Sequence, residues 1–280
     1  MSRYDSWDKA VRRPLPELVL LGALAVTLAP IVWMVVTAVN APRDIISSGW
    51  DFSPGLDNVR SLFSRDSVVA HQIYNSLVIV AGTVVICLSI AAVAGYSLSQ
   101  LAWSRRLTVA LLGSAGLLQL VPPMALVPGL YITLQSLGLI NSVPGLVVVN
   151  VIFNLPFAAV MMKIYFDAVP GEIREAGVVD GASEWRVFRA LQLPLVVPGL
   201  AAVSVFVAIQ AWNEFLFGLT MTTGGPTAPM TVGIAGLVQP QEVQFGPMAA
   251  IGSITAIPII LLAVMANRQI VAGLTGGAVK

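Results

Sequence analysis

The chain has very few of the side chains that carry out catalysis or bind metal ions. Cys87 is its one cysteine and His71 its one histidine, which excludes an intrachain disulfide and any metal site built from several cysteines. The lysines are Lys9, Lys163 and Lys280, and none follows a glycine, so there is no glycine-rich phosphate loop that ends in lysine. The chain cannot supply its own ATPase by this route, and an enzyme is disfavoured.

Charge is also scarce. Only 10% of the residues are charged, 57% are hydrophobic, and the mean hydropathy is +0.86, while a helix needs about 20 apolar residues to cross a bilayer. Runs without a charged residue cover 18–42, 67–104, 107–162, 190–213 and 243–267, and the third is interrupted by a turn at 136–145. We therefore predict an all-α integral membrane protein with six spans, near 16–40, 73–100, 107–133, 144–165, 195–221 and 246–267.

The distribution of lysine and arginine predicts the orientation. Six spans place both ends of the chain on one side, and that side holds all the basic residues except Arg43, Arg60 and Arg65. Because basic residues favour the cytoplasmic side, we expect both termini in the cytoplasm, with the basic start of the chain as an uncleaved anchor. The net charge of +1 gives no reason to expect a nucleic-acid partner.

One segment breaks the rule of scarce charge. Eight of the charged residues lie between Asp167 and Arg189, on the predicted cytoplasmic side. We predict a short helix at 172–179, a turn at 180–183 and a second helix at 184–191, which Ser183 caps and Pro194 ends. The second helix carries an apolar stripe of Trp185, Phe188 and Leu191, and small residues leave the other surface open to close approach. A solvated amphipathic loop is the alternative.

The sequence of this segment, "EAGVVDGASEWRVFRALQLP", resembles the EAA loop of bacterial ABC-importer permeases. Glu175, Ala176 and Gly181 occupy pattern positions, as does the Leu-Pro pair at its end, whereas Gly177 replaces the second alanine and Leu191 replaces isoleucine. "AWNEFLFGLTMT", "APMTVGIAGL" and "NRQIVAGLTGGAVK" resemble one branch of that family, the second permease subunit of maltose-type sugar importers. The resemblance covers nearly the whole chain.

The resemblance implies the type I ABC importer permease fold and a set of partners. These are a second, homologous permease, two ATPase subunits that bind ATP and magnesium, and an extracytoplasmic substrate-binding protein. This chain would hold no cofactor, and residues 225–238 would face the binding protein. The domains would be a cytoplasmic segment at 1–15, a membrane domain at 16–267 with its coupling loop at 167–194, and a cytoplasmic tail at 268–280. The expected substrate is a sugar; a glycerophosphodiester or polyamine, or a membrane scaffold role, are the alternatives.

Two sets of contacts with the ATPases follow from the resemblance. In the coupling loop they comprise Glu175, Ala176, Gly177, Asp180, Gly181, Ala182, Leu193 and Pro194. In the tail they comprise Arg268, Gly273, Leu274, Thr275, Gly277 and Lys280.

Polar side chains within the spans are candidates for a substrate path. Asn150 and Asn154 are four residues apart in the fourth span, as are Gln210 and Glu214 in the fifth, so each pair would share one helix face. Amides are costly against lipid, and these faces should point inward. Bonding between helices is the alternative. A cluster of prolines at 122–128 predicts an unwound segment beside this path. The candidates are Gln119, Asn150, Asn154, Gln210, Asn213 and Glu214.

Overall fold

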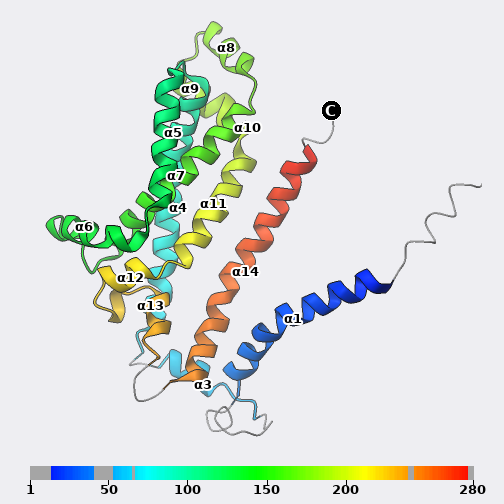
Figure 1. Ribbon diagram of the computed structural model, residues 1–280, viewed down its shortest axis with the longest axis vertical. Coiled ribbons are helices and arrows are strands. Elements are labelled where there is room, and N and C mark those ends of the chain that lie inside the picture. The colour runs from blue at the N-terminus through cyan, green and yellow to red at the C-terminus, as the bar shows by residue number, and fades with distance from the viewer. Residues whose placement is uncertain (1–13, 41–52, 65–66, 239–242, 277–280) are drawn as a thin grey trace, which may run out of the picture. The chain divides into compact units, whose positions relative to one another are not determined.

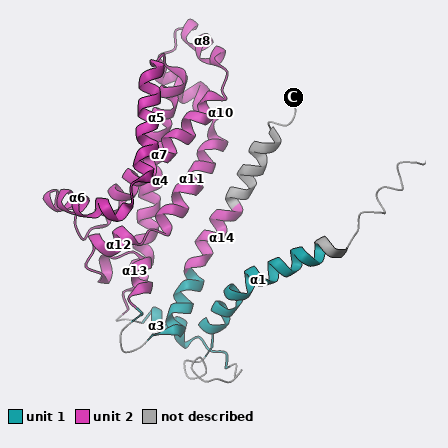
Figure 2. Ribbon diagram, in the orientation of Figure 1, with its two compact units in different colours: residues 1–65, 237–254 teal, residues 66–236, 255–280 magenta. Residues whose placement is uncertain are grey.

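The computed structural model describes residues 14–40, 53–64, 67–238 and 243–276, with side chains described between 17 and 264. Most of these residues are helical, and they fall into two compact units, within residues 1–65 with 237–254 and within residues 66–236 with 255–280 (Figure 2). Four helices are long and apolar enough to span a bilayer, and two bent helix pairs raise the number to as many as six. The predicted all-α membrane fold is therefore confirmed.

The first unit contains α1 (Pro14–Ala38), α3 (Asp57–Leu62) and the beginning of α14 (Phe245–Gly276). Asn58, which is buried, donates its amide to the carbonyls of Ala38 (3.2 Å) and Asn40 (2.8 Å). These bonds cap the end of α1, where the last carbonyls have no partner within the helix. A side chain at Gly246 would collide with the Asn58 amide, so α14 must begin with a glycine close to this point.

The second unit is built around two long helices, α4 (Val69–Gln100) and α7 (Val143–Asp167) (Figure 1). Cys87, Ala91, Val149 and Met162 are fully buried between these helices and their neighbours. A Cβ atom at Gly95 would lie 2.7 to 2.8 Å from Met162 and the Lys163 nitrogen. The missing side chain thus lets the two backbones approach closely, and α5 (Arg105–Leu120) and α11 (Val197–Trp212) pack beside this pair.

The predicted third span is broken rather than continuous. α5 ends at Leu120, α6 (Pro123–Ser136) begins after Val121 and Pro122, and the two helices meet at 102°. Proline disfavours a helical conformation of the residue before it, and two consecutive prolines end α5 for that reason. The predicted break beside the prolines is therefore present, but it is confined to two residues, since Pro128 lies inside α6.

The predicted fifth span is also divided. A helical segment formed by α9 (Glu184–Arg186), the π-helix η1 (Val187–Gln192) and α10 (Leu193–Leu195) meets α11 at 78°. This break falls at Val196, two residues beyond the expected stop at Pro194. α11 then ends at Trp212, and a separate helix, α12 (Leu216–Met221), follows. Glu214 lies between them, so the prediction that it shares a helix face with Gln210 is wrong.

The connections at the two ends of the second unit are helical as well. α8 (Gly171–Val179) and α9 lie at one end, and α12, η2 (Gly225–Thr227) and α13 (Met230–Ala235) lie at the other (Figure 1). α4 extends from one group to the other, and α7 runs beside it.

Candidate functional site

The charged segment folds as the sequence predicts, into two short helices joined by a tight turn. Gly181 has a φ of +81°, a conformation that glycine adopts without steric cost. The nitrogens of Gly181 and Ala182 donate to the carbonyls of Val178 (3.0 Å) and Gly177 (2.9 Å), which satisfies the end of α8. Ser183 accepts a hydrogen bond from the Arg186 nitrogen at 3.4 Å, the predicted cap of the next helix.

The exposed surface of this segment differs from the sequence-based prediction at one residue, Gly177. Glu175, Ala176, Asp180 and Gly181 are exposed, so they form an accessible surface on α8 and the turn that follows. Gly177 is buried and does not belong to that surface. A Cβ atom at Gly177 would lie 2.7 Å from Leu191 and 3.1 Å from Val187, which are side chains of η1. Glycine at this position therefore serves the packing of α8 on η1.

The predicted apolar stripe of the second helix is only partly correct. Phe188 is 5% exposed and contacts the rings of Tyr96 and Phe166, whereas Trp185 is 60% exposed. Trp185 still packs on Phe188 at a ring-centroid distance of 5.2 Å, so the two side chains share one side of the segment, with Phe188 in the core and Trp185 outside it. Of the remaining predicted coupling residues, Ala182 and Leu193 are half-buried and Pro194 is exposed.

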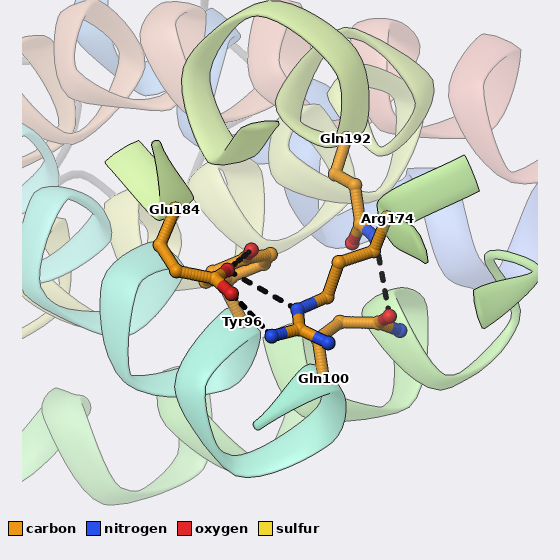
Figure 3. A network of polar contacts seen from close by, with 5 residues as sticks. All are labelled: Tyr96, Gln100, Arg174, Glu184 and Gln192. Atoms are coloured by element: carbon orange, nitrogen blue, oxygen red, sulfur yellow. Dashed lines mark hydrogen bonds and ion pairs between the residues drawn. The ribbon is translucent and has the colours of Figure 1, made fainter. Parts of the chain in front are cut away.

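A polar network ties this segment to the end of α4 (Figure 3). Arg174 of α8 forms an ion pair with Glu184 of α9, and the Tyr96 hydroxyl donates to the same carboxylate at 2.7 Å. These hydrogen bonds, first from Arg174 and then from Tyr96, lower the pKa of the Glu184 carboxyl, because they stabilise its charged form. The network therefore joins α8, α9 and α4 at one point.

The amide side chains of Gln100 and Gln192 lie next to this network (Figure 3). Gln192 is fully buried and donates to the Gln100 side-chain oxygen at 3.1 Å, and Gln100 donates to the Phe166 carbonyl at 2.9 Å. These contacts are not among those predicted from the sequence. The one available signal is that Tyr96 and Gln100 are four residues apart at the end of a span, where they share a helix face.

All six candidates for the substrate path line one cavity of about 730 Å³ in the second unit. Its walls come from the α5–α6 break, from α7, and from the segment that joins α11 to α12. Leu118, Leu130, Phe153 and Phe217 supply apolar surface. The polar lining consists of Gln119, Asn150, Asn154, Gln210, Asn213 and Glu214.

Several of the amides bind backbone carbonyls close to them in the chain. Asn150 donates to the Leu146 carbonyl (2.9 Å), Asn154 to the Asn150 carbonyl (2.8 Å) and Asn213 to the Ile209 carbonyl (2.8 Å). Gln119 instead reaches the Phe153 carbonyl of α7 at 3.3 Å. One of these amides thus joins two helices, two are bonded within α7, and Asn213, just beyond α11, bonds back to its last turn.

Glu214 is the ionisable residue in the cavity lining, and it is held by the backbone of α12. Its carboxylate oxygens accept from the nitrogens of Phe217 (2.7 Å) and Gly218 (3.0 Å). The nitrogens at the start of a helix have no carbonyl partner within it, and a carboxylate is favoured there. The Thr231 hydroxyl of α13 donates to the Glu214 carbonyl at 2.7 Å, so this residue fixes both α12 and α13.

At the beginning of α4, which is the end away from the charged segment, three buried polar side chains hold the segment 222–236. Gln72 donates to the Gly225 carbonyl (3.0 Å), and Asn75 donates to the carbonyls of Pro226 (2.7 Å) and Ala228 (3.1 Å). Ser76 accepts from the Met230 nitrogen at 2.9 Å. The segment is thereby attached to α4 through its main chain, whatever side chains it presents outward.

Asn141, from the turn before α7, holds the same segment from another side. Its side-chain oxygen accepts from the Thr223 nitrogen (3.1 Å) and from the hydroxyls of Thr223 (3.2 Å) and Thr227 (2.6 Å). Asn141 has a φ of +56°, which asparagine tolerates better than most residues.

Within the part of the chain that the structure describes, no group of three or more histidine, cysteine or acidic side chains is arranged to hold a metal ion.

Comparison with known proteins identifies the family. Residues 87–274 match the family described as binding-protein-dependent transport system inner membrane component. The chain belongs to this family of transport permeases. The probable ABC transporter permease protein y4oR of Sinorhizobium fredii is 35% identical over 91% of this chain and 91% of its own. The trehalose transport system permease protein SugB of Mycobacterium tuberculosis is 34% identical over 80% of this chain and 81% of its own.

Solved structures of other permeases share the fold. A bacterial ABC transporter involved in the import of the acidic polysaccharide alginate gives a TM-score of 0.77 at 18% identity, over 96% of this permease and 98% of that chain. A second structure, of bacterial alginate ABC transporter in complex with alginate pentasaccharide-bound periplasmic protein, gives 0.69 at 15% identity, over 93% and 96%. At these identities the likeness concerns the permease fold alone.

The role of Glu214 in this permease can be tested by two substitutions. Glu214→Ala is expected to lower the free energy of unfolding by about 1 kcal/mol, because two nitrogens at the start of α12 lose their acceptors. Glu214→Gln retains one side-chain oxygen and should lose less. Thermal unfolding of the purified permease in detergent measures both changes. Equal stability of the two variants and the wild type would contradict the capping role.

Proposed function

We propose that this chain is one permease subunit of an ATP-driven importer that takes up a sugar by alternating access. The observation that carries the proposal is the cavity, which places five amide side chains and one carboxylate together in a member of the binding-protein-dependent permease family. Sugar hydroxyls exchange hydrogen bonds with amides and need no buried countercharge. The substrates named for several relatives are the sugars trehalose, maltose and diacetylchitobiose, which supports this substrate class.

The partners that we propose are a second homologous permease, two ATPase subunits and an extracytoplasmic binding protein. Lacking a phosphate loop of its own, the chain would receive the energy of ATP from those ATPases, which hold ATP and magnesium. The exposed surface of α8, with Glu175 and Asp180, is suited to dock in a cleft of one ATPase. The segment 222–236, which contains most of the predicted 225–238, would face the binding protein on the other side of the membrane, with both chain termini in the cytoplasm.

The proposed contact between the tail and the ATPases involves residues at the edge of the described chain. α14 continues as a helix to Gly276, beyond the apolar segment that ends at Val264, so the tail at 268–276 extends a spanning helix. The side chains of Arg268, Gly273, Leu274 and Thr275, and the whole of Gly277 and Lys280, lie outside the described residues.

The proposal is tested by reconstitution of the complete complex in vesicles. Vesicles that contain both permeases and the ATPases are expected to accumulate a radiolabelled sugar only when ATP and the sugar-loaded binding protein are present. Binding-protein-stimulated ATP hydrolysis should rise together with uptake. A complex that hydrolyses ATP without regard to the binding protein, and accumulates none of a panel of sugars, would contradict the proposal.

The path through the cavity is tested by cysteine accessibility. In a background with Cys87→Ala, single cysteines at positions 150, 154, 210 and 214 are expected to react with a water-soluble thiol reagent at rates that change when ATP binds, because alternating access changes their exposure to water. Val148→Cys is the matched control, since Val148 is exposed on α7 but lies outside the cavity lining. Uniform protection of the four positions in every nucleotide state would indicate that the amides only pack helices.

A further inference from the structure

α4 differs from the other long helices in having no internal proline. Among the helices that the structure describes over more than 20 residues, α1, α7 and α14 contain Pro30, Pro156 and Pro258, whereas α4 contains none over its 32 residues. A proline removes one backbone hydrogen bond and introduces a kink. α4 is therefore an uninterrupted helix of about 48 Å, at 1.5 Å per residue.

The first end of this helix is bonded to the main chain of the segment 222–236. Gln72, Asn75 and Ser76 are all less than 9% exposed, and together they bind four backbone groups of that segment. A Cβ atom at Gly233 would collide with the Gln72 amide, so the contact is also close in space. Buried hydrogen bonds of this kind are expensive to break, because the groups left behind have no water to replace their partners.

The other end of the helix is bonded to the segment 171–195, here through side chains of that segment. The Tyr96 hydroxyl binds the carboxylate that also pairs with Arg174, and Gln100 binds Gln192 (Figure 3). Tyr96 is 5% exposed, and its ring contacts Phe188 of η1 at a centroid distance of 5.1 Å. The single helix α4 thus holds both the segment 222–236 and the segment 171–195, each through a buried aromatic or polar contact.

We infer that α4 carries the segments 222–236 and 171–195 as one rigid body, with Gln72 and Asn75 as positioning residues at one end and Tyr96 at the other. A displacement of either segment then moves the other, with no change of internal shape required. This inference rests on the proposed function, in which the two segments face the binding protein and an ATPase. It adds the mechanical path between them, which runs through specific hydrogen bonds.

The inference is tested directly by a distance measurement in the complete complex. Two spin labels are placed on exposed residues, at Pro226→Cys and Glu172→Cys, in a background with Cys87→Ala. The distance between the labels is expected to be the same in the nucleotide-free complex and in the complex trapped with an ATP analogue. A change of several ångströms between these states, in a complex that still transports, would overturn the inference.

Two substitutions test the positioning residues, one at each end. Tyr96→Phe removes a single hydrogen bond to a carboxylate, and Asn75→Ala removes two bonds to carbonyls. Each is expected to broaden the distance distribution between the labels and to lower the stimulation of ATP hydrolysis by the loaded binding protein about five- to tenfold, while unstimulated hydrolysis is unchanged. Tyr74→Phe, on an exposed tyrosine of the same helix, is the matched control.

The outcomes separate this inference from the proposed function. A wild-type complex that takes up no sugar counts against the proposed function, and the label distance is then irrelevant to transport. Uptake with a variable label distance counts against the rigid connection alone. If a variant fails to assemble, the wild-type label pair still decides the question.

Discussion

Replacing Glu175 with alanine is expected to abolish ATP-driven uptake or to reduce it at least about tenfold, while the complex still assembles. Glu175 is exposed on α8, so its removal opens no cavity in the core. We propose that its carboxylate pairs with a basic residue of the ATPase; a lost partner in a desolvated charge pair costs about 2 to 5 kcal/mol. Uptake and binding-protein-stimulated ATP hydrolysis measure the effect. Glu172→Ala, also exposed on α8, is the control and should transport normally.

A bulky side chain at the following turn extends this prediction. Gly181→Trp is expected to reduce binding of the ATPases to the permease, because the indole fills the surface on which the ATPase would lie. Since Gly181 has a positive φ, any side chain also strains the turn. Gly181→Ala carries that strain without the bulk and separates the two effects. Normal uptake in both Glu175→Ala and Gly181→Trp would refute the docking role of this segment.

The second large effect is expected at Gly95, where α4 packs directly against the backbone of α7. Gly95→Ala should destabilise the permease by about 3 kcal/mol, the upper end of the usual cost of overpacking. The added Cβ atom would lie 2.8 Å from the Lys163 nitrogen and the Met162 carbonyl carbon, which are backbone atoms that cannot rotate away. Thermal unfolding in detergent and the yield of assembled complex measure the loss.

Gly113→Ala is the control for this experiment, because no heavy atom lies within 4 Å of a Cβ atom placed at Gly113. It adds the same methyl group to a neighbouring helix and should keep or slightly raise stability, since alanine favours helix more than glycine does. If Gly95→Ala unfolds at the same temperature as Gly113→Ala, the close packing of α4 on α7 does not limit stability.

Much of the fold and of the candidate site follows from local sequence patterns. The charge-free runs mark the apolar helices because charge is costly in the bilayer. Gly181 and Ser183 mark the turn of the charged segment because each suits one local backbone conformation. The six path candidates line one cavity, as is expected if lipid disfavours amides on every helix alike and directs them toward a common interior.

The remaining features depend on contacts between distant residues or on small changes of helix geometry. The π-helix η1 lies within a segment that has an ordinary helical pattern, so local spacing does not predict it. Gly177 is buried because Val187 and Leu191 lie against it, a contact that no local spacing reveals. Glu214 is four residues from Gln210, a spacing that would place both on one face of a continuous helix. Instead, the Glu214 carboxylate accepts hydrogen bonds from the first nitrogens of the separate helix α12. The hydrogen bonds of this carboxylate favour the start of α12 over a continuation of α11 through Glu214.

The bonding of Asn150 and Asn154 affects how α7 enters the membrane during synthesis. Each amide donates one N–H to the carbonyl four residues earlier in the same helix, so one donor of each amide has its partner within α7 itself. A polar side chain that had to wait for a partner would oppose partition of the segment into lipid. The bonds within α7 therefore lower the cost of inserting it as an individual helix before it packs on α4, because part of each amide's hydrogen-bonding capacity is already used.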